Sequence, residues 1–170
     1  MPITAYIGFG SNLGDLLDNL EKASQHMAAH PEITLKRLSK LYETEPLKKE
    51  HDEKHPWYLN CVMEIETSLT LHKLLQALKN IEHTMGRRTR SRWQPRNVDL
   101  DILFFGDVIY EDKELHIPHR SLAERNFVLK PLCDLIPGFI HPEFNMTLQD
   151  IFASSQDPLL VRELNNTGIT

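Results

Sequence analysis

An α+β fold is predicted by two hydrophobic periods that alternate along the chain. Short apolar or alternating runs indicate four strands, and apolar residues at helical spacing indicate two longer helices between them. The resulting order is strand, helix, strand, strand, helix, strand. With right-handed crossovers, this order gives a ferredoxin-like βαββαβ core, in which helices cover one face of an antiparallel sheet.

The first strand is expected over residues 3–9, an apolar run that ends in glycines followed by Ser11 and Asn12. A helix should follow and stop near His30-Pro31, because the residue before a proline avoids the helical conformation. Its apolar stripe consists of Leu13, Leu16, Leu17, Leu20, Ala23 and Met27. A second strand is expected over residues 34–44, and a long loop over residues 45–57, which carry two prolines and many charges.

The third strand is expected over residues 58–67, where apolar and polar residues alternate. Thr70 should cap the second helix, and Gly86 should end it. The stripe of that helix consists of Leu71, Leu74, Leu75, Leu78, Ile81 and Met85. The later elements are expected to be a strand over 98–105, a small hairpin over 108–117, helices over 127–135 and 147–154, and a frayed tail over 165–170.

Length and composition narrow the class of protein. The 170 residues, 41% of them hydrophobic, suit one domain over 1–170 with a single core. A net charge of −5 disfavours a general nucleic-acid binder, which needs clustered positive charge, and also disfavours a binder of anionic membranes. No signal peptide or membrane span is visible, so we expect a cytoplasmic protein whose two cysteines, Cys61 and Cys133, are reduced core thiols.

A pair of carboxylates, Asp99 and Asp101, lies on the predicted fourth strand. Alternate residues of a strand share a face, so both side chains should project away from the face that carries Val98, Leu100, Ile102 and Phe104. Two adjacent acids are favourable if a hard cation such as Mg²⁺ sits between them. Taken alone, the pattern favours a strand with one solvated face, where acids only add solubility.

An arginine-rich run precedes that strand. Residues 86–96 hold five of the nine arginines of the chain and no acid. Guanidinium groups grip phosphate oxygens in a fixed planar geometry. Arginines beside acids that hold Mg²⁺ are the recurring parts of phosphoryl transfer, which a solvated basic loop does not explain.

An aromatic and an amide share one face of the third strand. Tyr58 and Asn60 offer a flat surface together with a donor and an acceptor, which suits a heterocycle with an amide-like edge. Thr44, Pro46 and Leu47 could form the neighbouring wall. His119 is a further candidate because an imidazole can donate a hydrogen bond to a phosphate. The glycines of Gly8-Phe9-Gly10 resemble a dinucleotide-binding loop, but its third glycine is missing, so we interpret them as a structural turn.

The sequence resembles the 6-hydroxymethyl-7,8-dihydropterin pyrophosphokinases of folate biosynthesis over nearly its whole length. The shared motifs are Gly10-Ser11-Asn12-Leu13, Tyr58-Leu59-Asn60, the run from Arg92 to Leu103, Ile117-Pro118-His119 and Arg125-Asn126-Phe127. The resemblance implies transfer of the pyrophosphoryl group of ATP to the pterin hydroxymethyl oxygen, with release of AMP. No obligatory protein partner is evident.

The resemblance also assigns roles to individual residues. It implies that Asp99 and Asp101 bind two Mg²⁺ ions, and that Arg87 and Arg96 steady the transferring group. It places the pterin among Thr44, Pro46, Leu47, Tyr58, Asn60, Trp93 and Phe127. It places ATP among Glu82, Arg88, Arg92, Ile102, His119 and Arg125. Whether Arg88 or Arg90 takes the second arginine role in the loop stays open.

Two other functions compete with this hypothesis. An RNA-binding module on the same fold predicts a basic sheet face and an aromatic strand motif, and that motif is absent from the sequence. A small-molecule sensor without chemistry would tolerate loss of the two aspartates.

Overall fold

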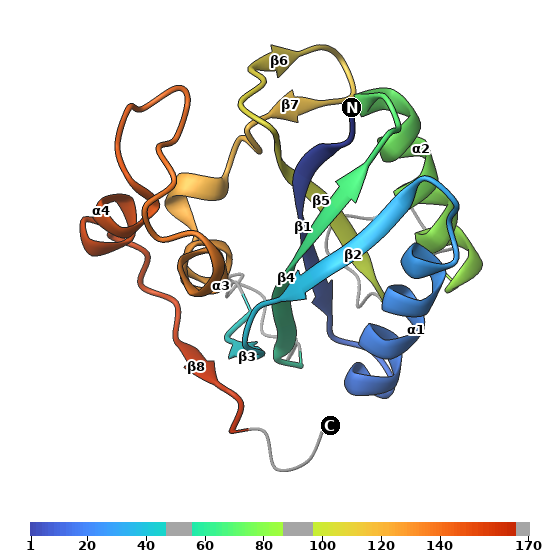
Figure 1. The fold of residues 1–170 in the computed structure, drawn as a ribbon. Coiled ribbons are helices and arrows are strands. Elements are labelled where there is room, and N and C mark those ends of the chain that lie inside the picture. Colours follow the sequence, from blue (N-terminus) through green and yellow to red (C-terminus); the bar gives the residue numbers. More distant parts are fainter. Residues whose placement is uncertain (47–55, 87–96, 166–170) are drawn as a thin grey trace.

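A six-stranded antiparallel sheet forms the centre of the computed structural model, which describes residues 1–46, 56–86 and 97–165 (Figure 1). The main strands are β1 (Ile3–Ser11), β2 (Ile33–Leu38), β3 (Tyr42–Thr44), β4 (Tyr58–Thr67) and β5 (Asp99–Phe105). The sheet order is β5-β1-β4-β3-β8, where β8 is Val161–Glu163, and β2 also pairs with β4. The long strands β1 and β4 therefore lie at the centre of the sheet, and each of them pairs with more than one other strand.

Helices cover both faces of this sheet. On one face, α1 (Leu16–Ala28) and α2 (Leu71–Thr84) bury the main core, which includes Phe9, Met63 and Leu100. On the other face, α3 (Asn126–Leu135) and α4 (Leu148–Ala153) pack on Val62 and Phe104. The two core helices share one face as predicted, and the C-terminal helices, which the predicted core did not place, carry enough apolar surface to close the second face.

The predicted second strand is split into β2 and β3. Both segments pair with β4, and Ser39 lies between them. The Ser39 N–H donates to the carbonyl of Val62 at 2.9 Å, while its Oγ accepts the Val62 N–H at 2.9 Å. This side-chain bond replaces one backbone hydrogen bond of the ladder at the point where the strand is interrupted.

A β-bulge interrupts β5. Tyr6 pairs with Phe104 and Ile7 pairs with Ile102, so Leu103 is the extra residue on β5. A bulge reverses the alternation of side chains beyond it. Phe104, which we expected beside Leu100 and Ile102, therefore packs into the second core with α3.

The helix boundaries follow local chemistry. Asp15 caps α1 by accepting the Asp18 N–H at 3.0 Å, so the helix begins after Leu13. Leu13 and Leu17 are both exposed, contrary to the expected stripe. Thr70 caps α2 as predicted, and Gly86 has a φ of +94°, a conformation that favours glycine.

The remaining elements are small. The hairpin is β6 (Tyr110–Glu111) with β7 (His116–Ile117), and a 3₁₀ turn spans Leu122–Glu124. No hydrophobic pattern in the sequence predicted the strand β8. Cys61 is buried and Cys133 is half-buried. No helix in the described ranges has both the length and the apolar character needed to cross a membrane.

Candidate active site

The candidate site has a floor made from three neighbouring strands. Asp99 of β5 pairs with Gly10 of β1, and Gly10 pairs with Asn60 of β4. One step along the same face, Asp101 pairs with Gly8. Because paired residues project to the same side of a sheet, the two carboxylates and the amide share one face.

The alternation of β5 confirms that both aspartates turn away from the main core. Leu100 and Ile102 are buried against α1 and α2, whereas Asp99 and Asp101 are half-buried on the opposite face. Within the part of the chain that the structure describes, no three His, Cys, Asp or Glu side chains are grouped to hold a metal ion. Two carboxylates fit a Mg²⁺ ion whose other ligands come from phosphates and water.

The two glycines of β1 are site residues that the sequence interpretation missed. A Cβ on Gly10 would lie 3.1 Å from Oδ1 of Asn60, and a Cβ on Gly8 would lie 3.4 Å from Cδ2 of Leu103. Both residues lie within a regular strand and not in the expected turn. Glycines two residues apart in a strand leave one face bare, which is the signal that could have identified them.

A buried amide–hydroxyl pair borders this bare floor. The Nδ2 of Asn60 donates to Oγ1 of Thr44 at 2.5 Å, and both side chains are buried. Tyr58 is half-buried opposite Thr44 in the β3–β4 ladder, and Pro46, two residues after Thr44, is also half-buried. Leu47 lies outside the described residues.

Glu82 ties α2 to β5. Its Oε1 accepts the Leu100 N–H at 2.7 Å, and the side chain is only 5% exposed. The Leu100 N–H therefore points away from β1. Backbone groups alternate in direction along a strand, so the Ile102 N–H points away from β1 as well. The Ile102 side chain is buried on the other face, so only its backbone is available to a ligand.

His119 lies near both Asp99 and Arg125. The His119 N–H donates to the carbonyl of Leu103 at 3.0 Å, which places this residue beside β5. Burial lowers the pKa of His119, the Arg125 charge lowers it further, and the Asp99 charge opposes them. Arg125 lies over the ring of Phe127, with its Cζ 5.7 Å from the ring centre.

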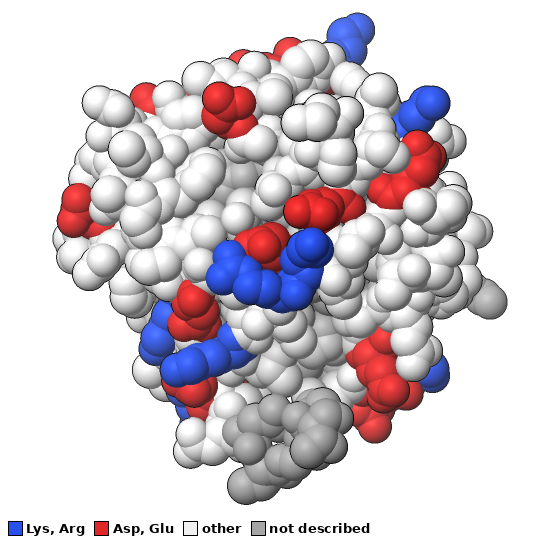
Figure 2. Space-filling view, in the orientation of Figure 1, with Lys and Arg blue, Asp and Glu red and all other residues white. Residues whose placement is uncertain are grey.

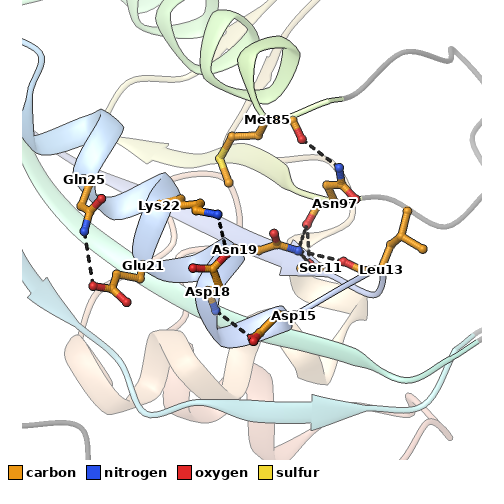
Figure 3. Close-up of polar contacts among 10 residues, drawn as sticks. All are labelled: Ser11, Leu13, Asp15, Asp18, Asn19, Glu21, Lys22, Gln25, Met85 and Asn97. Atoms are coloured by element: carbon orange, nitrogen blue, oxygen red, sulfur yellow. Dashed lines mark hydrogen bonds and ion pairs between the residues drawn. The ribbon is translucent and has the colours of Figure 1, made fainter.

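An asparagine-based network joins the elements around the arginine-rich run (Figure 3). Asn97 donates from Nδ2 to the carbonyl of Met85 at 2.8 Å, which joins the end of α2 to the start of β5. The Asn97 carbonyl accepts from Oγ of Ser11 and from Nδ2 of Asn19, the latter at 3.2 Å. The predicted site residues Arg87, Arg88, Arg92, Trp93 and Arg96 lie outside the described residues, as does Arg90.

Charges of both signs are mixed on the surface that the described residues form. On the described part of the face in Figure 2, basic side chains lie beside acidic ones. Ion pairs include Arg37 with Glu64, and Arg162 with Glu43. The two aspartates on the sheet face likewise oppose the basic face that an RNA-binding module needs.

A half-buried acid pair that can hold Mg²⁺, with a histidine and an arginine nearby that can contact phosphate oxygens, supplies parts that enzymes use to transfer phosphate groups. The comparisons with known proteins identify which group of enzymes this is. A family model described as 7,8-dihydro-6-hydroxymethylpterin-pyrophosphokinase (HPPK) matches residues 6–137, and the chain belongs to this family of pyrophosphokinases.

Relatives support the same family. A Methylorubrum extorquens protein named 2-amino-4-hydroxy-6-hydroxymethyldihydropteridine pyrophosphokinase is 40% identical over 136 residues, or 80% of this chain and 84% of its own length. A Bacillus subtilis protein of the same name is 40% identical and is matched over 77% of each chain.

Larger proteins contain the same unit. The Folic acid synthesis protein fol1 of Schizosaccharomyces pombe is 40% identical over 86% of this chain, which spans only 20% of that protein. The Plasmodium falciparum HPPK-DHPS structure with pteroate has a TM-score of 0.71 at 16% identity. It matches 90% of this chain and 44% of its own, and it shows the same fold.

Proposed function

We propose that this chain transfers the pyrophosphoryl group of ATP to the hydroxymethyl oxygen of 6-hydroxymethyl-7,8-dihydropterin, releasing AMP in tetrahydrofolate synthesis. The paired residues Asp99, Gly10 and Asn60 are the main support for this proposal. They place an acid that can bind a cation and an amide that can hydrogen-bond a pterin ring on one face of the sheet, with a glycine between them. We also propose that residues 1–170 form one ferredoxin-like domain. The order β5-β1-β4-β2, with α1 and α2 on one face, supports this topology.

The nucleotide would lie along the β5 end of the floor. Asp99 and Asp101 would hold two Mg²⁺ ions with the ATP phosphates, and His119 and Arg125 would contact the phosphates. When bound, Mg²⁺ supplies charge neutralisation at the phosphate oxygens. Glu82 and the Ile102 backbone line the edge of β5, where nucleotide contacts are expected.

The pterin would lie at the β3–β4 end of the floor. Asn60 and Thr44 would read its polar edge, and the rings of Tyr58 and Phe127 would enclose its faces. The amide–hydroxyl bond fixes the direction of the Asn60 carbonyl, which supports this role. Pro46 and Leu47 would line the same pocket. Trp93 would complete the pterin site, Arg88 and Arg92 would bind ATP, and Arg87 and Arg96 would act on the transferring group.

The transfer is a displacement at the β-phosphorus of ATP. The pterin oxygen forms a bond to this phosphorus while the bond to the α,β-bridging oxygen breaks, so that AMP leaves with the bridging oxygen and the hydroxyl proton passes to solvent. Positioning and charge stabilisation supply the catalysis, and no covalent enzyme intermediate is required. His119, whose pKa is lowered by burial, would offer a neutral imidazole N–H to a phosphate at pH 7.

The test is incubation of the purified protein with ATP, Mg²⁺ and the pterin, with AMP followed by chromatography. We expect AMP and pterin diphosphate in equal amounts. Asp99→Asn should lower the rate by at least about 100-fold, because it removes a charge that holds the metal–nucleotide complex. Asp107→Asn is the matched control, since Asp107 is exposed in the turn after β5. Formation of ADP, or equal rates in the two variants, would contradict the proposal.

A further inference from the structure

The C-terminal strap, residues 157–164, follows the last residue matched by the family model and reaches the proposed pterin pocket. In Figure 1 the chain descends from α4 to β8, which pairs with β3. Val161 of β8 pairs with Thr44. The Glu45 N–H donates to the Leu160 carbonyl at 3.0 Å, and the Leu160 N–H donates to Oε2 of Glu45 at 3.2 Å.

The other end of the strap holds the start of α3. Oδ2 of Asp157 accepts the Asn126 N–H at 2.8 Å, while its Oδ1 accepts the Leu159 N–H at 3.0 Å. The N-cap residue of α3, Arg125, makes no capping bond with its own side chain. Asp157 therefore supplies the cap from a distant part of the chain, and its charge suits the positive end of the helix.

The direction of α3 explains why this cap bears on the pocket. The Leu135 carbonyl accepts from Nη1 of Arg37 at 3.3 Å, and Asp134 accepts from the Tyr42 hydroxyl at 2.7 Å. One turn earlier, Nζ of Lys130 lies 5.4 Å from the centre of the Tyr42 ring. The C-terminal half of the helix therefore lies over Tyr42 of β3 with its last residue at Arg37, and its first residues, held by Asp157, lie at the opposite end from Arg37.

We propose that Asp157 is a positioning residue that, through the strap, fixes the spacing between the α3 wall and the β3–β4 wall of the pterin pocket. The inference rests on the proposed function, because it takes Phe127 and the Asn60–Thr44 pair as the two walls. Asp157 binds the residue before Phe127, and the strap then binds Thr44 and Glu45. One short segment therefore holds both walls, which otherwise belong to separate elements.

A purely structural role predicts a different outcome. If the strap only adds stability, removal of the carboxylate lowers the free energy of unfolding and leaves the pterin affinity of the folded protein unchanged. If it sets the spacing of the walls, pterin binding weakens in fully folded protein, while turnover at saturating substrate changes little. The ratio of these effects separates the two roles.

The experiment measures pterin binding by its fluorescence, in the presence of Mg²⁺ and an α,β-methylene ATP analogue, which cannot transfer its pyrophosphoryl group. Asp157→Ala should raise the pterin Kd about fivefold, the effect of losing one helix cap. Asp157→Asn keeps a neutral acceptor and should raise it about twofold, since bonds to charged acceptors are roughly twice as strong. In turnover assays the pterin KM should rise similarly while kcat stays within about threefold.

Asp150→Ala is the control, because Asp150 is exposed on α4 and its loss changes the net charge equally. Pterin Kd values equal to wild type in both Asp157 variants would overturn the positioning role and leave the proposed function intact. If Asp157→Ala does not fold, Asp157→Asn decides by the same criterion. If the wild-type protein does not bind the pterin, the proposed function fails and the inference fails with it.

Discussion

Replacement of Gly10 by alanine tests the floor of the candidate site most sensitively. The added Cβ would lie 3.1 Å from Oδ1 of Asn60, so the amide must move by a few tenths of an ångström. Asn60 is only 6% exposed and bonds to Thr44 at 2.5 Å, which leaves it little room to move. Misalignment of one amide hydrogen bond costs about 1 kcal/mol, so we expect the pterin Kd to rise about fivefold.

Gly10→Ala should also change the free energy of unfolding, through two opposing effects. Overpacking costs about 1–3 kcal/mol, whereas removal of a glycine from a strand gains about 0.5–1 kcal/mol. The net loss in the free energy of unfolding is therefore about 0–2.5 kcal/mol, measurable by urea denaturation.

Two other glycines provide controls for this substitution. The assay is the fluorescence titration with the ATP analogue present. A Cβ on Gly138 meets nothing within 4 Å, so Gly138→Ala should leave the pterin Kd unchanged. A Cβ on Gly8 meets only the flexible side chain of Leu103, so Gly8→Ala should have a smaller effect than Gly10→Ala. An unchanged Kd in Gly10→Ala would show that the Asn60 amide does not read the ligand.

Two further predictions concern stability. Glu82→Leu leaves the buried Leu100 N–H without its acceptor and should lower the free energy of unfolding by about 1–3 kcal/mol. Glu82→Gln retains an acceptor and should lower it less. Equal losses in urea denaturation would contradict this prediction. Burial lowers the pKa of His141, so at acidic pH the unfolded chain binds more protons than the folded protein. The contribution of the neutral His141 to the free energy of unfolding is present in full above about pH 6.5, and it is lost as the pH falls toward the folded-state pKa. The loss between pH 7.5 and 5.5 should be smaller in His141→Phe, and an identical loss would refute this origin.

Local periodicity predicted the elements whose neighbours lie on one clear face. The alternation of β4 correctly separated Cys61 and Met63 from Asn60 and Val62. The cap at Thr70 was equally readable, because a cap depends on residues within one turn. The shared face of the two aspartates also follows from strand alternation alone.

Contacts between distant segments account for what periodicity missed. The bulge at Leu103 arises from pairing between β1 and β5, which no window of residues around it records. Gly8 and Gly10 were interpreted as a turn because glycine usually marks one, yet pairing on both sides extends β1 through them. Asp157 caps a helix that begins 31 residues earlier, so sequence patterns near α3 contain no sign of it.

The pairing of Asp99 and Asp101 with a metal–nucleotide complex can be seen directly in a crystal structure with Mg²⁺ and the α,β-methylene ATP analogue. We predict that an oxygen of each aspartate lies about 2.1 Å from a Mg²⁺ ion that also contacts the phosphates. Nucleotide bound elsewhere, or aspartates with no cation beside them, would contradict a pyrophosphoryl-transfer site on this face of the sheet.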